Sequence, residues 1–196
     1  MKQLFILSLS ICLLWQCETS TSNQTAAAGE DGWTDLFNGE DLTGFKKLNG
    51  EADYTVKDGV IIGTTKPNTP NTFMATEKMY SDFALQLEYR VHDAINSGIQ
   101  IRSNSLPDYR EGRVHGYQVE IDPSDRSWSA GIYDEARRGW LYPLSVNEDA
   151  RQAFKHNDWN EVYVECIGNT IKTWLNGTPV SHLIDDMTSE GFIALQ

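Results

Sequence analysis

The chain has 196 residues, of which 40% are hydrophobic and 11% aromatic, so it can form one domain with its own core and a short leader. Its formal net charge is -12 at pH 7. Nucleic-acid phosphates require a basic surface, so this charge argues against a nucleic-acid partner. It equally disfavours charge-driven binding to an anionic membrane.

The N-terminus predicts export from the cytoplasm. The apolar run Leu4–Trp15 is too short to span a bilayer comfortably, and Cys17 follows it directly. This arrangement is typical of a bacterial lipoprotein signal over 1–17, with lipidated Cys17 as the first mature residue and 18–31 as a flexible tether. Gln16 stands where such signals carry a small residue, which leaves an ordinary cleaved signal peptide as the alternative. Both readings place the protein in the periplasm or at the outer membrane, with only a lipid anchor as membrane contact.

From residue 32 to 196, short alternating segments predict a β-rich domain. Phe83–Val91 alternates through its whole length, whereas helical periodicity is convincing only at 147–155. Lys57–Gly59 and Asn176–Gly177 have the composition of hairpin turns. Many strands joined by hairpins predict an antiparallel β-sandwich. The other strands are expected at 97–102, 116–122, 129–133, 162–167, 170–175 and 191–196.

Cys166 is the only cysteine beyond the predicted leader, so the domain contains no disulfide. Its place on an alternating strand predicts a small core residue.

The final strand-like segment, 191–196, has no turn after it, and the edge of a sandwich needs another strand to cover it. We therefore expect the domain over 32–196 to lack its last strand.

Two runs, Ser97–Arg102 and Gly116–Asp122, alternate strictly between apolar and polar residues. Successive side chains on a strand point to opposite faces. If the two runs are neighbours in one sheet, their polar side chains line a single surface that can hold a polyhydroxylated ligand. These side chains are Gln100, Arg102, Gln118, Glu120 and Asp122.

The polar surface contains several candidates for chemistry. Glu120 is either a general base held on a rigid strand or one partner of a structural ion pair with Arg102. His115 can act as base, acid or metal ligand, or be incidental. Asp122 can bind a divalent metal ion together with Glu120, because oxygen ligands suit hard cations, or it begins the turn that follows.

The segment 133–142 predicts a loop in which three aromatic residues and two arginines gather. Trp140 and Tyr142 can stack on a sugar ring, while Arg137 or Arg138 can donate to its oxygens. The alternative is a hydrophobic flap over the sandwich edge. The candidate substrate-binding residues are Gln100, Gln118, Tyr133, Arg138 and Trp140.

Motifs along nearly all of residues 32–196 resemble the DUF1080 proteins, also called the 3-keto-disaccharide hydrolase family. Their order and spacing together carry the resemblance, which implies a concanavalin A-like (laminarinase G-like) jelly roll. The matching segments are Gly32–Gly39, Asn96–Ile99, Gly116–Asp122, Gly131–Tyr133, Asp158–Asn160, Trp174–Gly177 and Gly191–Gln196.

The resemblance implies cleavage of glycosides that carry a ketone at sugar C3. Such a ketone acidifies the C2 proton, which Glu120 or His115 would remove, while Arg102 or a bound divalent cation stabilises the enolate. Loss of the C1 oxygen gives an enone, and water addition completes a net hydrolysis. Trp140 would serve as the ring platform. Two other readings of the domain are a non-catalytic carbohydrate-binding module and a structural lipoprotein domain.

Overall fold

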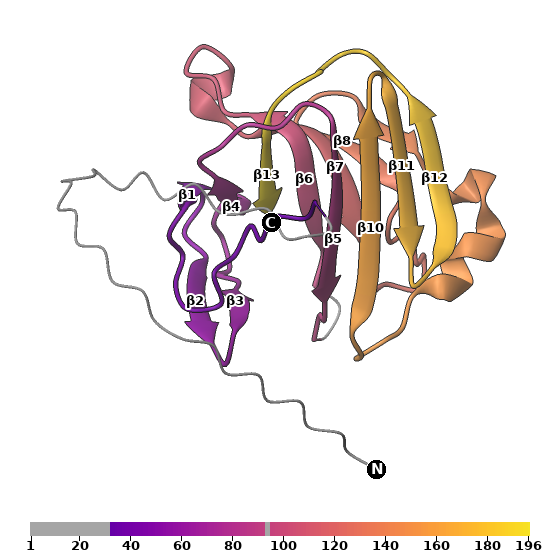
Figure 1. Cartoon of the computed structure of the whole chain (residues 1–196), viewed down its shortest axis with the longest axis horizontal. Helices are drawn as coiled ribbons and strands as arrows, with labels where there is room; N and C mark the ends of the chain where they lie inside the picture. Colours follow the sequence, from indigo (N-terminus) through magenta and orange to yellow (C-terminus); the bar gives the residue numbers. More distant parts are fainter. Residues whose placement is uncertain (1–31, 93–94) are drawn as a thin grey trace, which may run out of the picture. The chain divides into compact units, whose positions relative to one another are not determined.

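The computed structural model describes residues 32–92 and 95–196, which consist mainly of strands joined by turns and loops (Figure 1). The predicted lipoprotein signal, Cys17 and almost all of the tether lie outside the described residues. Within the described part of the chain, no helix combines the length and apolar character that crossing a membrane requires. Residues Leu36–Gln196 form one compact unit.

Thirteen strands and three short 3₁₀ helices make up this described structure. The third helix, η3 (Glu148–Ala153), falls inside the segment 147–155, where the sequence predicts helical periodicity. The strands are Phe45–Asn49 (β1), Asp53–Lys57 (β2), Val60–Thr64 (β3), Thr72–Thr76 (β4), Phe83–Tyr89 (β5), Ser97–Asn104 (β6), His115–Ile121 (β7), Ile132–Glu135 (β8), Gly139–Tyr142 (β9), Asn160–Ile167 (β10), Thr170–Leu175 (β11), Thr178–Ile184 (β12) and Phe192–Leu195 (β13). The helices are Arg110–Gly112 (η1), Leu144–Val146 (η2) and Glu148–Ala153 (η3).

Two antiparallel sheets face each other and form the sandwich that the sequence predicts. The larger sheet has the strand order β1-β4-β13-β6-β7-β8-β9, and the smaller has the order β12-β11-β10-β5. Figure 1 shows the smaller sheet in front of the strands β6 to β8. The hairpin β2–β3 forms a separate two-stranded sheet.

The main core lies between the two sheets, where the apolar residues of each alternating strand meet. Ile99, Ile101 and Val119 of the larger sheet are fully buried, as are Val164 and Cys166 of the smaller one. Burial raises the pKa of the Cys166 thiol to about 12, so this residue packs as a small apolar group, as predicted. A second apolar cluster lies on the opposite face of the larger sheet and comprises Phe73, Ala75, Val114, Phe192 and Ala194.

The two predicted hairpin turns are confirmed. Asp58 and Gly59 join β2 to β3 with φ values of 51° and 76°, and Asn176 and Gly177 join β11 to β12 with 50° and 79°. Two successive residues with positive φ give a tight turn whose twist matches that of the flanking strands. Asn, Asp and Gly adopt this backbone at low cost.

The region after β7 differs from the sequence prediction in two ways. The strand predicted at 129–133 begins only at Ile132, because Ala130 has a φ of 64° and belongs to the preceding turn. The segment 133–142, predicted as a loop, forms most of the hairpin β8–β9 at the edge of the larger sheet. Its aromatic side chains are therefore carried by strands.

Candidate functional site

The two alternating runs of the sequence are neighbouring antiparallel strands, β6 and β7. Gln100 lies opposite Gln118, and Gly98 lies opposite Glu120. Directly opposed residues of paired strands project from the same face of a sheet. Gln100, Gln118 and Glu120 therefore share one polar face, as predicted, which is the face opposite the main core.

Arg102 does not share that face, and the prediction that it does is wrong. The pairing jumps from Ile101 to Asn104, so β6 has an extra residue here, and Arg102 has a φ of 45°. Such a bulge reverses the alternation of side chains. The Arg102 guanidinium instead donates to Ser81 O at 2.6 Å, Gly168 O at 2.7 Å and the Asp82 carboxylate at 2.9 Å. It cannot stabilise an anion beside Glu120.

The bulge places Ser103 on the polar face in its stead, where it begins a chain of hydrogen bonds. Ser103 Oγ donates to Gln100 Oε1 at 2.7 Å, and Gln100 Nε2 donates to Gln118 Oε1. Gln118 Nε2 then donates to Glu120 Oε2 at 2.8 Å, and Asn96 Nδ2 donates to Glu120 Oε1. Only Asn96 is exposed, so the other four groups form a buried polar network.

The surroundings of Glu120, the candidate base on this face, shift the pKa of its carboxyl group. Burial raises its pKa above the ordinary glutamate range, although the hydrogen bonds from Gln118 and Asn96 oppose that rise. The Asp122 carboxylate raises the pKa further, whereas the Arg126 guanidinium lowers it. A raised pKa makes the ionised carboxylate a stronger base, which suits it to removing a proton from a substrate.

A cleft of about 580 Å³ opens beside Glu120. This volume is in the range of small-molecule sites. Four of the sequence-predicted site residues, Gln118, Glu120, Tyr133 and Trp140, contribute to its lining. Arg137, which the sequence offered as an alternative to Arg138, also lines the cleft. The lining residues that the sequence did not indicate include Asn71, Asn96, Arg110, Arg113, Arg126, Asp134 and Glu135.

An aromatic wall borders the cleft and holds Arg126. The Trp140 ring packs edge-on against Tyr133 and Trp128, with centroids 5.3 Å and 4.8 Å away. The Arg126 guanidinium lies 4.7 Å from the Trp128 ring and 5.0 Å from the Trp140 ring. The wall therefore combines ring faces with a cation, which is a suitable surface for a sugar.

Asp122 shapes the loop that carries Arg126, which corrects the predicted metal pair with Glu120. One Asp122 oxygen accepts from Ser124 N and Oγ, and the other accepts from Arg126 Nε at 2.7 Å and from Trp128 N. Burial raises its pKa, but these hydrogen bonds outweigh that effect and lower it overall. Among residues 32–92 and 95–196, no three acidic, histidine or cysteine side chains gather as a metal-binding group.

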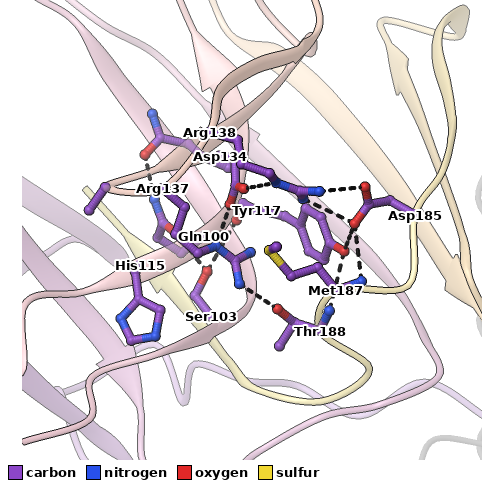
Figure 2. Close-up of polar contacts among 12 residues, drawn as sticks. Gln100, Ser103, His115, Tyr117, Asp134, Arg137, Arg138, Asp185, Met187 and Thr188 are labelled. Carbon is purple, nitrogen blue, oxygen red and sulfur yellow. Dashed lines mark hydrogen bonds and ion pairs between the residues drawn. The ribbon is translucent and has the colours of Figure 1, made fainter. Parts of the chain in front are cut away.

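His115 and Arg138 also lie apart from the cleft lining. His115 Nδ1 is 2.8 Å from Arg113 O, and its ring stacks 3.9 Å from that of Tyr109. Arg138 bridges Asp134 and Asp185 (Figure 2). The assignment of Arg138 to substrate binding is therefore wrong, because Arg138 does not line the cleft and its guanidinium is held by Asp134 and Asp185.

The model of the 3-keto-disaccharide hydrolase family, described as a 3-keto-alpha-glucoside-1,2-lyase-like domain, matches residues 32–196. The chain belongs to this family. A search of curated proteins finds no match.

Solved structures similar to this family member share its fold. A protein of Parabacteroides distasonis, provisionally described as a glycosyl hydrolase, has 19% identity and a TM-score of 0.60, over 82% of this chain and 85% of its own. The carbohydrate binding module CBM66 of Bacillus subtilis has 17% identity and a TM-score of 0.55, over 78% and 86%. A β-1,3-1,4-glucanase from a mouse hindgut metagenome has 14% identity and a TM-score of 0.50, over 80% and 82%. These likenesses agree with the predicted jelly-roll sandwich.

The ion cluster of this 3-keto-disaccharide hydrolase family member ties the β8–β9 turn to the end of β12. Asp134 is fully buried and accepts from Arg137 Nε at 2.7 Å and from Arg138 Nε at 2.5 Å (Figure 2). Arg138 lowers the pKa of Asp185 to about 2, and the Tyr117 hydroxyl donates to the same carboxylate. The cluster fixes the hairpin from which Tyr133 and Trp140 reach the cleft.

Gly98→Ala is expected to destabilise the domain by about 1–3 kcal/mol, because the Gln118 side chain already fills the space that the added methyl group would need. A Cβ at Gly98 would lie 2.5 Å from the Gln118 side chain. Gly63→Ala is the matched control, since a Cβ there meets Tyr54 at an ordinary 3.4 Å. Urea unfolding of both variants measures the difference. Equal midpoints for the two variants would contradict the packing argument.

Proposed function

We propose that this domain is a carbohydrate-active enzyme that cleaves the glycosidic bond of 3-keto-glycosides, with Glu120 as the base that removes the C2 proton. The observation that carries the proposal is a buried carboxylate with a raised pKa in the lining of a polar cleft with an aromatic wall. Membership of a family of 3-keto-glucoside lyase-like domains supports the same substrate class.

The reaction needs a base and an anion-stabilising group on one side of the sugar. Glu120 takes the proton from C2, and the electrons of that C–H bond form an enolate with the C3 ketone. Collapse of the enolate expels the C1 oxygen with the aglycone, which becomes protonated as it leaves, and a C1–C2 double bond remains. Addition of water across this bond gives the free 3-keto sugar, so a lyase stops before this step and a hydrolase completes it.

Arg126 is the cation that we assign to the developing enolate, in place of Arg102. Its guanidinium lies in the cleft lining between two tryptophan rings, and its charge acts on Glu120. A fixed cation stabilises negative charge that appears only during the reaction, without the cost of reorienting water. Trp140 and Tyr133 provide the platform on which the sugar ring stacks.

The pH dependence follows from the environment of Glu120. A base works only when ionised, and burial raises the pKa of this carboxyl. Activity should therefore be lost on the acid side at a pH above the ordinary glutamate range. The acid limb of a kcat/KM profile reports this group in the free enzyme. A limb at or below the ordinary glutamate pKa would count against Glu120 as the base.

The direct test is turnover of a chromogenic 3-keto-glucoside by the full chain, with and without added divalent cation. Aglycone release that is absent with the matching unoxidised glucoside would support the proposal, since only the ketone acidifies C2. Product analysis by NMR distinguishes the enone of a lyase from the 3-keto sugar of a hydrolase. No release under either metal condition would refute the activity.

A non-catalytic carbohydrate-binding module is the second candidate. One observation favours it: both Glu120 oxygens already accept hydrogen bonds from amides, as in a purely structural carboxylate. This reading expects calorimetric binding of the 3-keto-glucoside without turnover. Affinity should then fall in Trp140→Ala and remain unchanged in Glu120→Gln.

A further inference from the structure

The chain of hydrogen bonds from Ser103 to Glu120 has a direction. A side-chain amide donates at its nitrogen and accepts at its oxygen, so each glutamine passes on the orientation of its neighbour. Here the hydroxyl of Ser103 donates to Gln100, and both amides then present their nitrogens toward Glu120. If the two amides reversed, Gln118 would present an oxygen to the carboxylate.

Hydrogen bonds between Ser103, Gln100 and Gln118 could also form with both amides reversed, so a further contact must select the observed orientation of the amides. Ser103 Oγ also lies 3.2 Å from both Ile101 O and Tyr117 O, and could donate to either while accepting from Gln100. Its contact with Gln100 Oε1 is shorter, at 2.7 Å. Together with the charge on Glu120, this contact favours the observed orientation.

At two glycines the backbone packs closely against this chain of hydrogen-bonded side chains. A Cβ at Gly116, whose φ is +138°, would lie 2.4 Å from Ser103 Oγ. A Cβ at Gly98 would lie 2.5 Å from Gln118 Cδ. The backbone thus approaches Ser103 at one end of the chain and Gln118 toward the other, and both glutamines are at most 2% exposed. The four side chains, from Ser103 to Glu120, therefore form a closely packed polar network beside the cleft.

We propose that Ser103 is a positioning residue that, through Gln100 and Gln118, keeps a donor on Glu120 Oε2 and leaves Oε1 as the oxygen that takes the proton. Oε1 faces Asn96, the only exposed member of the network, whose amide can turn when that oxygen becomes protonated. Oε2 keeps its partner in both states of the carboxyl. The catalytic part of this inference rests on the proposed function, whereas the coupling of the four side chains does not.

The first experiment compares Ser103→Ala with Ser181→Ala in the full chain. Ser181 is a matched control because it is also buried and donates to a backbone oxygen, Ala130 O, away from the amides. Ser103→Ala should lower kcat on a 3-keto-glucoside about five- to tenfold with KM unchanged, while Ser181→Ala should leave both unchanged. If Ser103→Ala fails to fold, Ser103→Cys keeps the shape with a much weaker donor and is expected to lose kcat in the same way.

The second experiment measures the coupling without any activity. In ¹⁵N-labelled protein, Glu120→Gln should shift the side-chain amide signals of Gln100, although Gln118 lies between the two residues. Ser103→Ala should in turn shift the signals of Gln118, and Ser181→Ala should shift neither. Unchanged Gln100 signals in Glu120→Gln would overturn the relay even if the enzyme is active. Intact coupling in a protein without turnover would overturn only the proposed function.

Discussion

Glu120→Gln is expected to lower kcat on 3-keto-glycosides by about 10²- to 10⁴-fold, which is the usual contribution of a positioned general base. Glutamine has nearly the same shape as glutamate but cannot accept the C2 proton. Fold stability should not fall with activity, because burial of the charged form already opposes ionisation of Glu120, as its raised pKa indicates. Steady-state kinetics and thermal unfolding of the same preparations separate the two effects.

The matched control for this loss is Glu135→Gln. Glu135 is another carboxylate of the cleft lining, and its Oε1 lies 3.2 Å from a nitrogen of Arg113. Its substitution changes the charge of the cleft equally but leaves the proposed base intact. A similar loss in both variants would point to cleft charge rather than to a base at Glu120. An active Glu120→Gln would remove Glu120 from the mechanism.

Asp134→Asn is expected to destabilise the domain by about 3–5 kcal/mol, because it leaves the nearly buried Arg137 guanidinium without its ion-pair partner and takes one of two partners from Arg138. Asp134 has no exposed surface and is shared by Arg137 and Arg138, of which Arg137 is only 13% exposed. Breaking one member of such a cluster costs more than the pair contributes, since the remaining charge stays desolvated. Denaturant unfolding followed by tryptophan fluorescence measures the change.

The comparison for Asp134 is the exposed pair of Asp53 and Lys66. Asp53 is 59% exposed in its ion pair, and solvent screens such pairs almost completely. Asp53→Asn should therefore leave the unfolding midpoint nearly unchanged. If Asp134→Asn is equally harmless, the cluster does not hold the β8–β9 hairpin in place. If it unfolds the domain, the position of Trp140 depends on it.

Several features of the fold could be predicted from local sequence because local physics produces them. The alternation determines which residues of β6, as far as Ile101, and of β7 face the core. The pairs Asp58–Gly59 and Asn176–Gly177 favour tight turns in almost any context. Strand β4 was not among the predicted strands. All five of its residues are buried, so it lacks the polar alternation that marks a strand with one wet face.

Arg126 lines the cleft from the loop between β7 and β8, and local sequence patterns do not predict the conformation of such a loop. Its signal in the sequence was the spacing of Asp122, Arg126 and Trp128, which favours an acid-arginine contact beside an aromatic ring. The spacing alone does not say that Trp140, from the next hairpin, closes the other side. That contact depends on the pairing of β8 with β9.

The sequence by itself determined an antiparallel sandwich and a polar face with Glu120 among amides. Only the tertiary structure decided which side chains accompany Glu120. The bulge at Arg102 turned that arginine away and brought Ser103 in, and a residue outside β6 leaves room for it. A Cβ at Gly191 would lie 2.3 Å from the backbone of Arg102, so the glycine admits the bulged strand. Alternation is a property of neighbours in sequence, whereas a bulge depends on what the partner strand can accommodate.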